Sequence, residues 1–405
     1  MSSPIANHIP AHVPENLVFN YDYHGDPRVT NEVHASLKTI QDDAPPVFYT
    51  PKNGGHWVVS RFDEIKKVVE DYEVFSAKEM TIPRIENPPF FIPLNLDPPN
   101  NMPFRQALMP AFSPKAIKEL EGKIRHWAGS IIDEALAKGN GVDFVHEIAS
   151  VYPVSIFMEL MGMPMDRLWE FRTLSEAFFS TNDQEKIHQL GGQIVMNMTE
   201  ILEEKRAKPC DDLMSHILNI KVKGEPISLG EMQNMCFLLF LGGMDTVANV
   251  TGYAFRQLAN MPELQQRLID NPSDISKFTD EAIRMFGVIS NPRIVAKDST
   301  VFGVDFKKDD MVLCLLPISG RDERKNKNAH VFDIDRAKEE GSTLTFSSGP
   351  HMCIGSFLAR AEIRILVEEW FKRVSKYEIV PGTELGFRMG FSLALTQLPL
   401  NFQKI

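Results

Sequence analysis

The stretch from Phe346 to Gly355 constrains this chain more than any other. It reads Phe-Ser-Ser-Gly-Pro-His-Met-Cys-Ile-Gly, so Cys353 sits in a loop bounded by glycine and proline. A helical pattern follows, from Phe357 to Trp370. The positive end of a helix holds a nearby cysteine toward the thiolate, the form that attacks electrophiles or binds metal. A buried cysteine beside a turn is the alternative, since free cysteine is among the most buried residue types.

Composition narrows the function classes. The chain has 405 residues and a net charge of −11, which argues against nucleic-acid binding because that needs a basic surface. The cysteines show no Cys-x-x-Cys spacing, so we expect reduced thiols, no zinc and a cytoplasmic protein. Residues 1–27 are polar and rich in proline, without the apolar core of a signal peptide. The longest apolar run, residues 235–244, is too short to span a bilayer, so we expect no membrane association.

Short β-prone runs and helical patterns alternate along the chain. Residues 47–49 and 56–59 flank Pro51-Lys52-Asn53-Gly54-Gly55, which predicts a hairpin. A second hairpin is expected from residues 300–306 and 311–316 around 307–310. Residues 387–395 alternate like a strand around a glycine.

A long helix is predicted from Ser228 to Asn260, beginning with the capping box Ser228-x-x-Glu231. Its middle reads Leu-Gly-Gly-Met-Asp-Thr-Val over residues 241–247. Two glycines inside a helix cost about 1 kcal/mol each relative to alanine. One interpretation is a tolerated kink in which the threonine bonds the carbonyl four residues earlier; the other is a functional interruption.

Three motifs together resemble the cytochrome P-450 family: the Phe-x-x-Gly-x-x-x-Cys-x-Gly of residues 346–355, the Gly-Gly-x-Asp-Thr of residues 242–246, and Glu281-x-x-Arg284. The resemblance covers the C-terminal two thirds of the chain and is strongest to soluble bacterial members that oxidise camphor and other terpenoids. It implies a mainly α fold with a smaller β-rich part (α+β). The expected arrangement is one domain over residues 1–405, with β structure at about 40–80 and 295–320.

The resemblance also implies haem b, held between the long central helix and the cysteine loop. Cys353 would ligate the iron, and thiolate ligation favours cleavage of the O–O bond. Asp245 and Thr246 would deliver protons to dioxygen, while Gly242 and Gly243 would make room above the iron. The other cofactor-binding residues implied are Phe346, Gly349 and Gly355 of the loop and the propionate contacts Arg105, Arg293 and His351.

Two positions depart from the family pattern. Asn101 stands where many members have a histidine that reaches a propionate, which weakens one contact. Glu281 and Arg284 match a structural pair behind the haem, but the arginine that usually joins them is missing from residues 329–333. His330 is the candidate substitute.

The substrate and electron donor are less constrained. The proline-rich segment 81–99 is either a surface loop or, by the resemblance, the roof of a substrate pocket. Candidate pocket residues are apolar: Phe90, Phe91, Leu238, Leu239, Val288 and Phe391, with Phe178 and Phe179 as weaker candidates. They favour a small or medium hydrophobic substrate such as a terpenoid or norisoprenoid.

No Gly-x-Gly-x-x-Gly follows a strand, so NAD(P)H is not expected to bind, and electrons would come from a ferredoxin with its reductase. The basic residues Lys115, Lys118, Lys123 and Arg125 form either a solvated helix face or a docking patch for an acidic donor. Two rival functions remain: a peroxide-using haem-thiolate enzyme, which would lack Asp245 and Thr246, and a haem-thiolate sensor without turnover.

Overall fold

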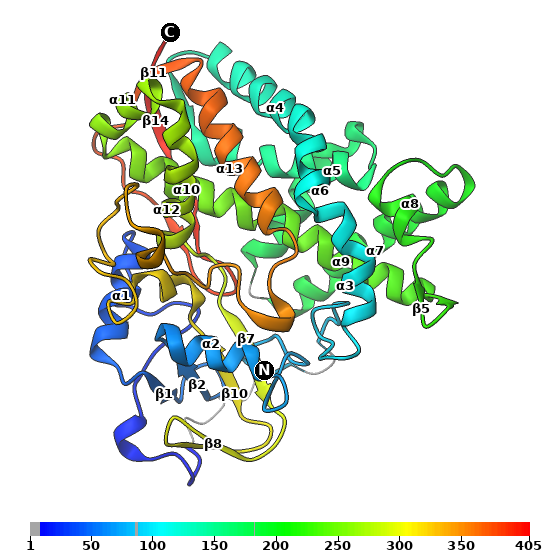
Figure 1. Cartoon of the computed structure of the whole chain (residues 1–405), viewed down its shortest axis with the longest axis vertical. Coiled ribbons are helices and arrows are strands. Elements are labelled where there is room, and N and C mark those ends of the chain that lie inside the picture. The colour runs from blue at the N-terminus through cyan, green and yellow to red at the C-terminus, as the bar shows by residue number, and fades with distance from the viewer. Residues whose placement is uncertain (1–8, 86–87, 182) are drawn as a thin grey trace.

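The computed structural model describes residues 9–85, 88–181 and 183–405 (Figure 1). Within these ranges the α-helices are α1 (Val33–Asp43), α2 (Phe62–Glu70), α3 (Met102–Leu108), α4 (Pro114–Ala137), α5 (Tyr152–Met161), α6 (Leu168–Ser180), α7 (Gln184–Ala207), α8 (Leu213–Ile217), α9 (Leu229–Met244), α10 (Thr246–Ala259), α11 (Pro262–Asp270), α12 (Ile275–Met285) and α13 (Ser356–Phe371). The strands are β1 (Val47–Thr50), β2 (His56–Val59), β3 (Phe75–Ser76), β4 (Gly141–Asp143), β5 (Lys221–Val222), β6 (Glu225–Pro226), β7 (Asn291–Val295), β8 (Ser299–Val301), β9 (Val304–Phe306), β10 (Met311–Cys314), β11 (Val374–Ile379), β12 (Phe387–Arg388), β13 (Ala394–Leu395) and β14 (Pro399–Lys404). The predicted α+β class, mainly helical with a smaller sheet part, is confirmed.

The main sheet has five strands in the order β1-β2-β10-β7-β3 and lies in the lower part of the molecule as drawn in Figure 1. The predicted hairpin of β1 and β2 is confirmed, with antiparallel pairing from Val47↔Val59 to Thr50↔His56. The second predicted hairpin is wrong. β10 does not fold back on β9 but joins the main sheet, parallel to β2 and antiparallel to β7.

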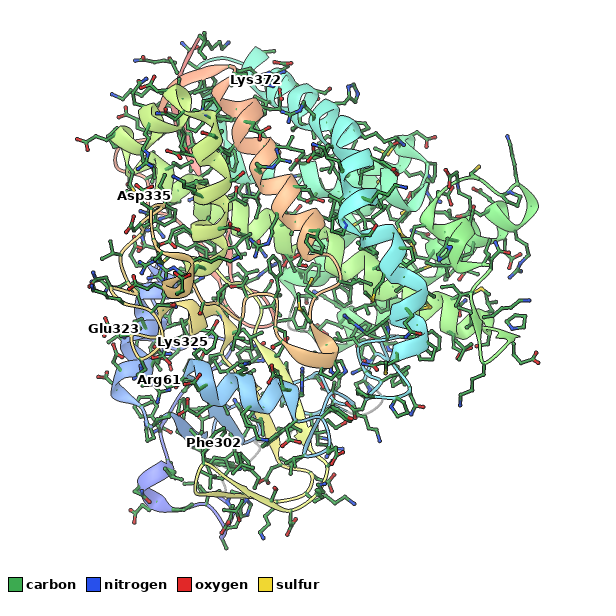
Figure 2. The ribbon with its side chains drawn as sticks, in the orientation of Figure 1. Arg61, Phe302, Glu323, Lys325, Asp335 and Lys372 are labelled. Atoms are coloured by element: carbon green, nitrogen blue, oxygen red, sulfur yellow. The ribbon has the colours of Figure 1, made fainter. Side chains whose placement is uncertain are left out.

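The turn that replaces the second hairpin is shorter than the sequence indicated. β8 and β9 pair across Phe302 and Gly303, which both have positive φ (55° and 73°), as a two-residue turn between twisted strands requires. Phe302 lies at an outer edge of the molecule (Figure 2). The charged run at residues 307–310 instead leads the chain into the main sheet.

The long helix predicted from Ser228 is interrupted. Its start is as predicted, with the complete capping box between Ser228 and Glu231. At Asp245, where φ is −103° and ψ is −38°, α9 ends and α10 begins. The Thr246 hydroxyl donates a hydrogen bond to the Gly242 carbonyl (3.0 Å), the local bond that a threonine offers when a helix bends.

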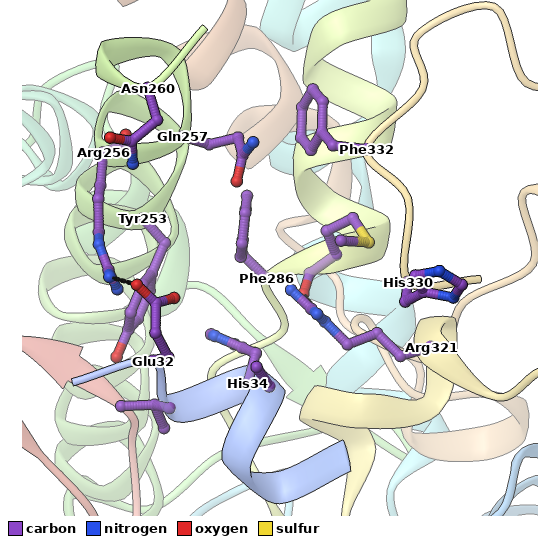
Figure 3. Close-up of a pocket in the computed structure, with 13 residues that line it drawn as sticks. Glu32, His34, Tyr253, Arg256, Gln257, Asn260, Phe286, Arg321, His330 and Phe332 are labelled. Carbon is purple, nitrogen blue, oxygen red and sulfur yellow. Dashed lines mark hydrogen bonds and ion pairs between the residues drawn. The ribbon is translucent and has the colours of Figure 1, made fainter. Parts of the chain in front are cut away.

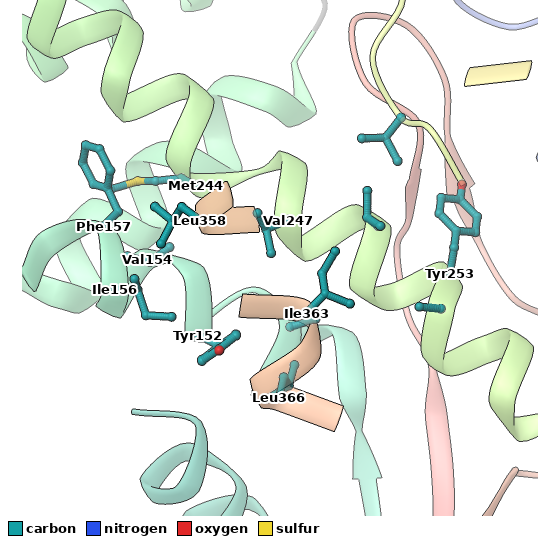
Figure 4. Close-up of a cluster of buried hydrophobic side chains, with 14 of the residues drawn as sticks. Tyr152, Val154, Ile156, Phe157, Met244, Val247, Tyr253, Leu358, Ile363 and Leu366 are labelled. Atoms are coloured by element: carbon teal, nitrogen blue, oxygen red, sulfur yellow. The ribbon is translucent and has the colours of Figure 1, made fainter. Parts of the chain in front are cut away.

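The two helices still form one apolar core element. The span Leu229–Ala259 is long and apolar enough to cross a membrane, but two thirds of its most apolar window (67%) is buried inside the protein, as in a core helix. Figure 4 shows side chains of α5, α9, α10 and α13 meeting around Val247 and Ile363. This packing fixes α13, and with it the loop that carries Cys353, against the interrupted helix.

Candidate active site around Cys353

The loop that precedes α13 is closed by its own backbone and fastened to α2. The Cys353 N–H donates to the Phe346 carbonyl (2.9 Å), which joins the two ends of the motif. Gly349 has φ +67°, and a Cβ there would lie 3.0 Å from Cγ of Glu70. The Ser348 hydroxyl donates to the same Glu70 (2.5 Å). Gly349 is therefore required by backbone conformation and by its packing against α2.

Cys353 is solvent-accessible, although protein surrounds it on most sides. Burial raises the pKa of its thiol above the ordinary value, while the Gly355 backbone and the Arg105 guanidinium oppose that shift. The expectation that the loop and the start of α13 hold Cys353 toward the thiolate stays a prediction. A metal that binds this sulfur must displace its proton.

Two buried side chains on one side of this loop have unused hydrogen-bonding atoms. Arg293 on β7 is 1% exposed, and its Nη2 has no partner within the described part of the chain. His351 Nε2 donates to the Leu96 carbonyl (3.0 Å), so its buried Nδ1, which has no partner among the described residues, is an acceptor in the neutral ring. Burial, with Arg293 second, lowers the pKa of His351 to about 4. Such orphaned buried groups are costly unless a further partner satisfies them.

Arg105 and Asn101 tie α3 to the cysteine loop. Arg105 donates to the Met352 carbonyl (2.6 Å), and Asn101 Nδ2 donates to the Pro350 carbonyl (3.4 Å). Asn101 Oδ1 is a buried acceptor without a partner among the described residues. Asn101 therefore fixes the loop but turns no donor toward a carboxylate, in agreement with the weakened contact expected from the sequence.

On the opposite side of the site, the break in the central helix places the Asp245 carboxylate among several hydrogen-bond donors. Both oxygens of Asp245 lie near Arg388 Nη2 (3.1 and 3.4 Å). The Ser392 hydroxyl (2.6 Å) and Asn249 Nδ2 (2.7 Å) donate to Asp245 Oδ2. Arg388 belongs to the hairpin of β12 and β13, so this network joins the C-terminal hairpin to α10. Sequence reasoning missed Arg388 and Asn249; only the spacing of Asn249, four residues after Asp245, was available as a signal.

The adjacent glycines have different functions. A Cβ at Gly243 would lie 2.4 Å from Cδ2 of Phe157, so this glycine allows α9 to pack closely on α5. A Cβ at Gly242 would meet nothing within 4 Å, although Gly242 lies in the middle of a core helix. Of the two glycines, Gly242 borders open space, and the expectation that both make room over a cofactor stays a prediction.

The predicted ion pair of Glu281 and Arg284 is present and buried. Arg284 donates to both carboxylate oxygens of Glu281 (2.7 and 2.6 Å) and to the carbonyl of Ala329 (2.8 Å). The hypothesis that His330 joins this pair is wrong, since His330 is exposed and contacts Glu323 (3.1 Å). Arg336 is the third member: its side chain is 6% exposed, and its Nε lies 3.4 Å from Glu281 Oε1.

Four of the eight candidate pocket residues, Phe91, Phe178, Phe179 and Phe391, meet one another or Phe237 through aromatic contacts. Ring centroids lie 5.5 Å apart for Phe91 and Phe237, 5.8 Å for Phe237 and Phe178, and 6.3 Å for Phe179 and Phe391. This set joins the 81–99 segment, α9, α6 and the C-terminal hairpin. The sequence analysis did not select Phe237, because the helical pattern alone does not show which side chains of α9 face the site.

The remaining pocket candidates differ in how deeply they are buried. Val288 is buried and accepts a hydrogen bond from the Leu393 N–H (2.8 Å), so it lies beside the hairpin. Leu238 and Leu239 are half-buried. Phe90 is exposed, and no aromatic ring among the described residues stacks on it.

The basic residues of α4 do not form a free patch. Lys118 contacts Glu121 (2.8 Å) and Lys123 contacts Glu159 (2.7 Å). Arg125 donates to Glu368 and Glu369 of α13 (2.6 Å each) and so fastens two helices together. These neighbouring carboxylates favour the interpretation as a solvated and structural helix face.

Comparisons with known proteins agree on one family. The family model described as Cytochrome P450 matches residues 154–397. A probable cytochrome P450 127A1 of Sinorhizobium fredii is 30% identical over 93% of this chain and 92% of that protein. Linalool 8-monooxygenase of Pseudomonas putida is 26% identical over 92% of this chain and 95% of that protein. The crystal structure of CYP101J2 is 31% identical, with a TM-score of 0.90 over 98% of this chain and 99% of that one.

The chain belongs to the cytochrome P450 family, whose fold it has, and it is a haem monooxygenase with haem b as cofactor. The site residues fit that group. An accessible thiol, open space at Gly242 and the unpaired buried donor of Arg293 are what an iron and a propionate would use.

The network behind the site predicts which loop residue matters for stability. Arg336→Gln should lower the free energy of unfolding by about 1–3 kcal/mol, because buried acceptors lose their partner. His330→Gln, the matched control on the same loop, should change it by less than about 0.5 kcal/mol, because exposed pairs contribute little. Urea-induced unfolding followed by circular dichroism measures both. An equal or larger loss in the His330 variant would contradict the assignment.

Proposed function

We propose that this chain hydroxylates a small to medium hydrophobic substrate, a terpenoid or norisoprenoid, with electrons from a ferredoxin and its reductase. The observation that carries the proposal is the arrangement of an accessible Cys353 with open space at Gly242 and a positioned Asp245 on the interrupted helix. The reaction places one atom of dioxygen in a C–H bond of the substrate. The other atom leaves as water, which consumes two protons and two electrons.

The cofactor would be held by Cys353 on its iron and by Arg293, His351 and Arg105 near its propionates. Haem b with a thiolate ligand supplies the electron-rich iron that activates dioxygen. Arg293 offers its unused Nη2, and a planar guanidinium suits a carboxylate. His351 could donate from Nδ1 only as the imidazolium, because its Nε2–H is used by the Leu96 carbonyl.

Asp245 and Thr246 would pass protons into the site. Asp245 is oriented by Arg388, Ser392 and Asn249, so its carboxylate has a fixed direction. The Thr246 hydroxyl is engaged with the Gly242 carbonyl and becomes a donor to the site when it rotates away. A peroxide-using enzyme needs no such pair, which disfavours that rival. General acid–base groups in this position contribute about 10²–10⁴-fold to rates.

The apolar lining supports the substrate class. Phe91, Phe237 and Phe391 come from three separate segments, and the 88–93 window offers no hydroxyl to hold a ketone. The relative named linalool 8-monooxygenase acts on a terpenoid alcohol, which agrees with this class. A cytoplasmic location is part of the proposal, because the expected donor system operates there.

The donor is expected at the cysteine side of the molecule. Arg105 brings α3 against Met352, and Met352 and Met109 are exposed there. Exposed methionines adapt to a partner surface. We infer that a ferredoxin binds over this surface rather than over the paired lysines of α4.

The proposed function is tested with purified haem-loaded protein and a panel of terpenoids and norisoprenoids. At least one compound should convert the resting iron from low to high spin, because it displaces water from the apolar site. With ferredoxin, reductase and NADH, that compound should yield a hydroxylated product in proportion to NADH consumed. Binding without product under these conditions would favour the sensor, and product from hydrogen peroxide alone at equal rates would favour the peroxide-using enzyme.

The Asp245 network makes a second prediction. Asp245→Asn should lower kcat by about 10²–10⁴-fold, as expected for loss of an acid–base group. Arg388→Gln should lower kcat by about tenfold to a hundredfold, because a misdirected group loses its alignment. Both should raise the solvent kinetic isotope effect on kcat while leaving the substrate-induced spin change in place.

Lys376→Gln is the control, because Lys376 is an exposed cation on β11 outside the network. It should leave both kcat and the isotope effect unchanged. An Arg388→Gln variant with the parent rate and isotope effect would show that Arg388 does not position Asp245.

A further inference from the structure

Figure 3 shows a cavity of about 170 Å³ whose lining includes none of the residues placed around Cys353. It is formed where the start of α1, the end of α10, the end of α12 and the segment 316–321 meet. From this cavity we propose a site that binds a small oxyanion, the phosphate or carboxylate group of a small molecule. The inference goes beyond the monooxygenase function and does not depend on it.

The first argument is an excess of buried positive charge. Arg284, Arg321 and Arg336 surround one buried carboxylate, that of Glu281. Glu281 already accepts from Arg284 and Arg336 and from the Asp333 N–H (2.9 Å). One carboxylate for three arginines leaves two guanidinium groups without a carboxylate partner of their own in this cluster, and Arg284 and Arg336 donate their remaining N–H groups to backbone carbonyls.

Arg321 places one of these positive charges at the cavity. It is 8% exposed, and its Nε donates to the Met285 carbonyl (3.1 Å). Its two terminal nitrogens have no hydrogen-bond partner in the described part of the chain, and Figure 3 shows the side chain reaching inward toward Phe286 and His34. Burial, and then Arg284, lower the pKa of Arg321 to about 10, so it remains a cation at neutral pH.

The second argument is the start of α1, which faces the same cavity. Val33, His34 and Ala35 line it, and the structure gives their backbone N–H groups no acceptor among the described residues. Glu32, at the N-cap, makes no side-chain cap bond and instead pairs with Arg256. Free N–H groups at the positive end of an eleven-residue helix are a common anion site.

Tyr253 lines the cavity from α10 with its ring, while Figure 3 shows its hydroxyl pointing away from Arg321. Tyr253 is 2% exposed, and its buried hydroxyl has no partner among the described residues. His34 does not compete as a cation, because burial, followed by Arg321, lowers its pKa to about 3 and its Nε2 donates to the Gly287 carbonyl (2.7 Å). The ligand would therefore meet the Arg321 guanidinium and a helix end, beside the Arg256–Glu32 ion pair that also lines the cavity.

Size and shape limit the ligand. Liquid water occupies about 30 Å³ per molecule, so the cavity has room for an ion of four or five heavy atoms. Phe286 and Phe332 stack along one side (centroids 6.0 Å apart) and offer an apolar wall. Inorganic phosphate and acetate are therefore suitable probes, and a larger molecule would place only its anionic group here.

The test compares phosphate with chloride at equal ionic strength on the haem-loaded full chain. Phosphate should broaden its own ³¹P resonance in a saturable way and raise Tm by about 1–3 °C, because an anion that binds only the folded state stabilises it. A parallel titration with acetate distinguishes a tetrahedral from a planar anion, and a response to either supports the site. Identical behaviour in phosphate, acetate and chloride would overturn the proposal.

Three variants test whether the response to phosphate arises from this cavity. Arg321→Gln should abolish it, but this buried change also affects folding. Ala35→Asp, at an exposed position on the cavity, supplies an internal carboxylate and should raise Tm without phosphate while removing the phosphate response. Arg206→Gln removes an exposed arginine elsewhere and should respond like the parent protein. A full phosphate response in both the Arg321 and Ala35 variants would also overturn the proposal, because the anion would then bind elsewhere.

Discussion

The buried guanidinium of Arg284 is the constraint on which the loops behind the active site depend. A charge that is 1% exposed must be compensated, and Arg284 uses the Glu281 carboxylate together with the carbonyls of Gly320, Ala329 and Val331. These carbonyls lie 36, 45 and 47 residues after Arg284 in the sequence. The backbone at Gly320 approaches so closely that a Cβ there would meet the Arg284 carbonyl at 2.1 Å. One ion pair thus fixes the course of two loops.

The same helix connects this network to the cysteine loop. The Thr345 hydroxyl donates to the Ile283 carbonyl of α12 (2.8 Å), directly before the Phe346 motif begins. The loop is then closed on itself and fastened to α2 through Glu70. On the other side, the interruption at Asp245 gives α10 a carboxylate that the C-terminal hairpin holds. The site is therefore a meeting point of three fixed pieces, which gives it the preorganisation that catalysis needs.

Features with short sequence spacing could be predicted, and features that join distant segments could not. The capping box at Ser228, the Glu281–Arg284 pair and the cysteine motif are visible because their residues lie within one turn or loop. Arg388 and Arg336 act across 143 and 55 residues respectively, and nothing local marks them.

The most direct test is the absorption spectrum of the haem-loaded protein after reduction under carbon monoxide. The account predicts a strongly red-shifted Soret band, characteristic of thiolate opposite the carbonyl ligand, in the parent protein. Cys353→Ser should lose that band even where it retains haem. A parent protein that holds haem but gives no red-shifted band would contradict Cys353 as the ligand. The role assigned here to the 346–355 loop would then be wrong.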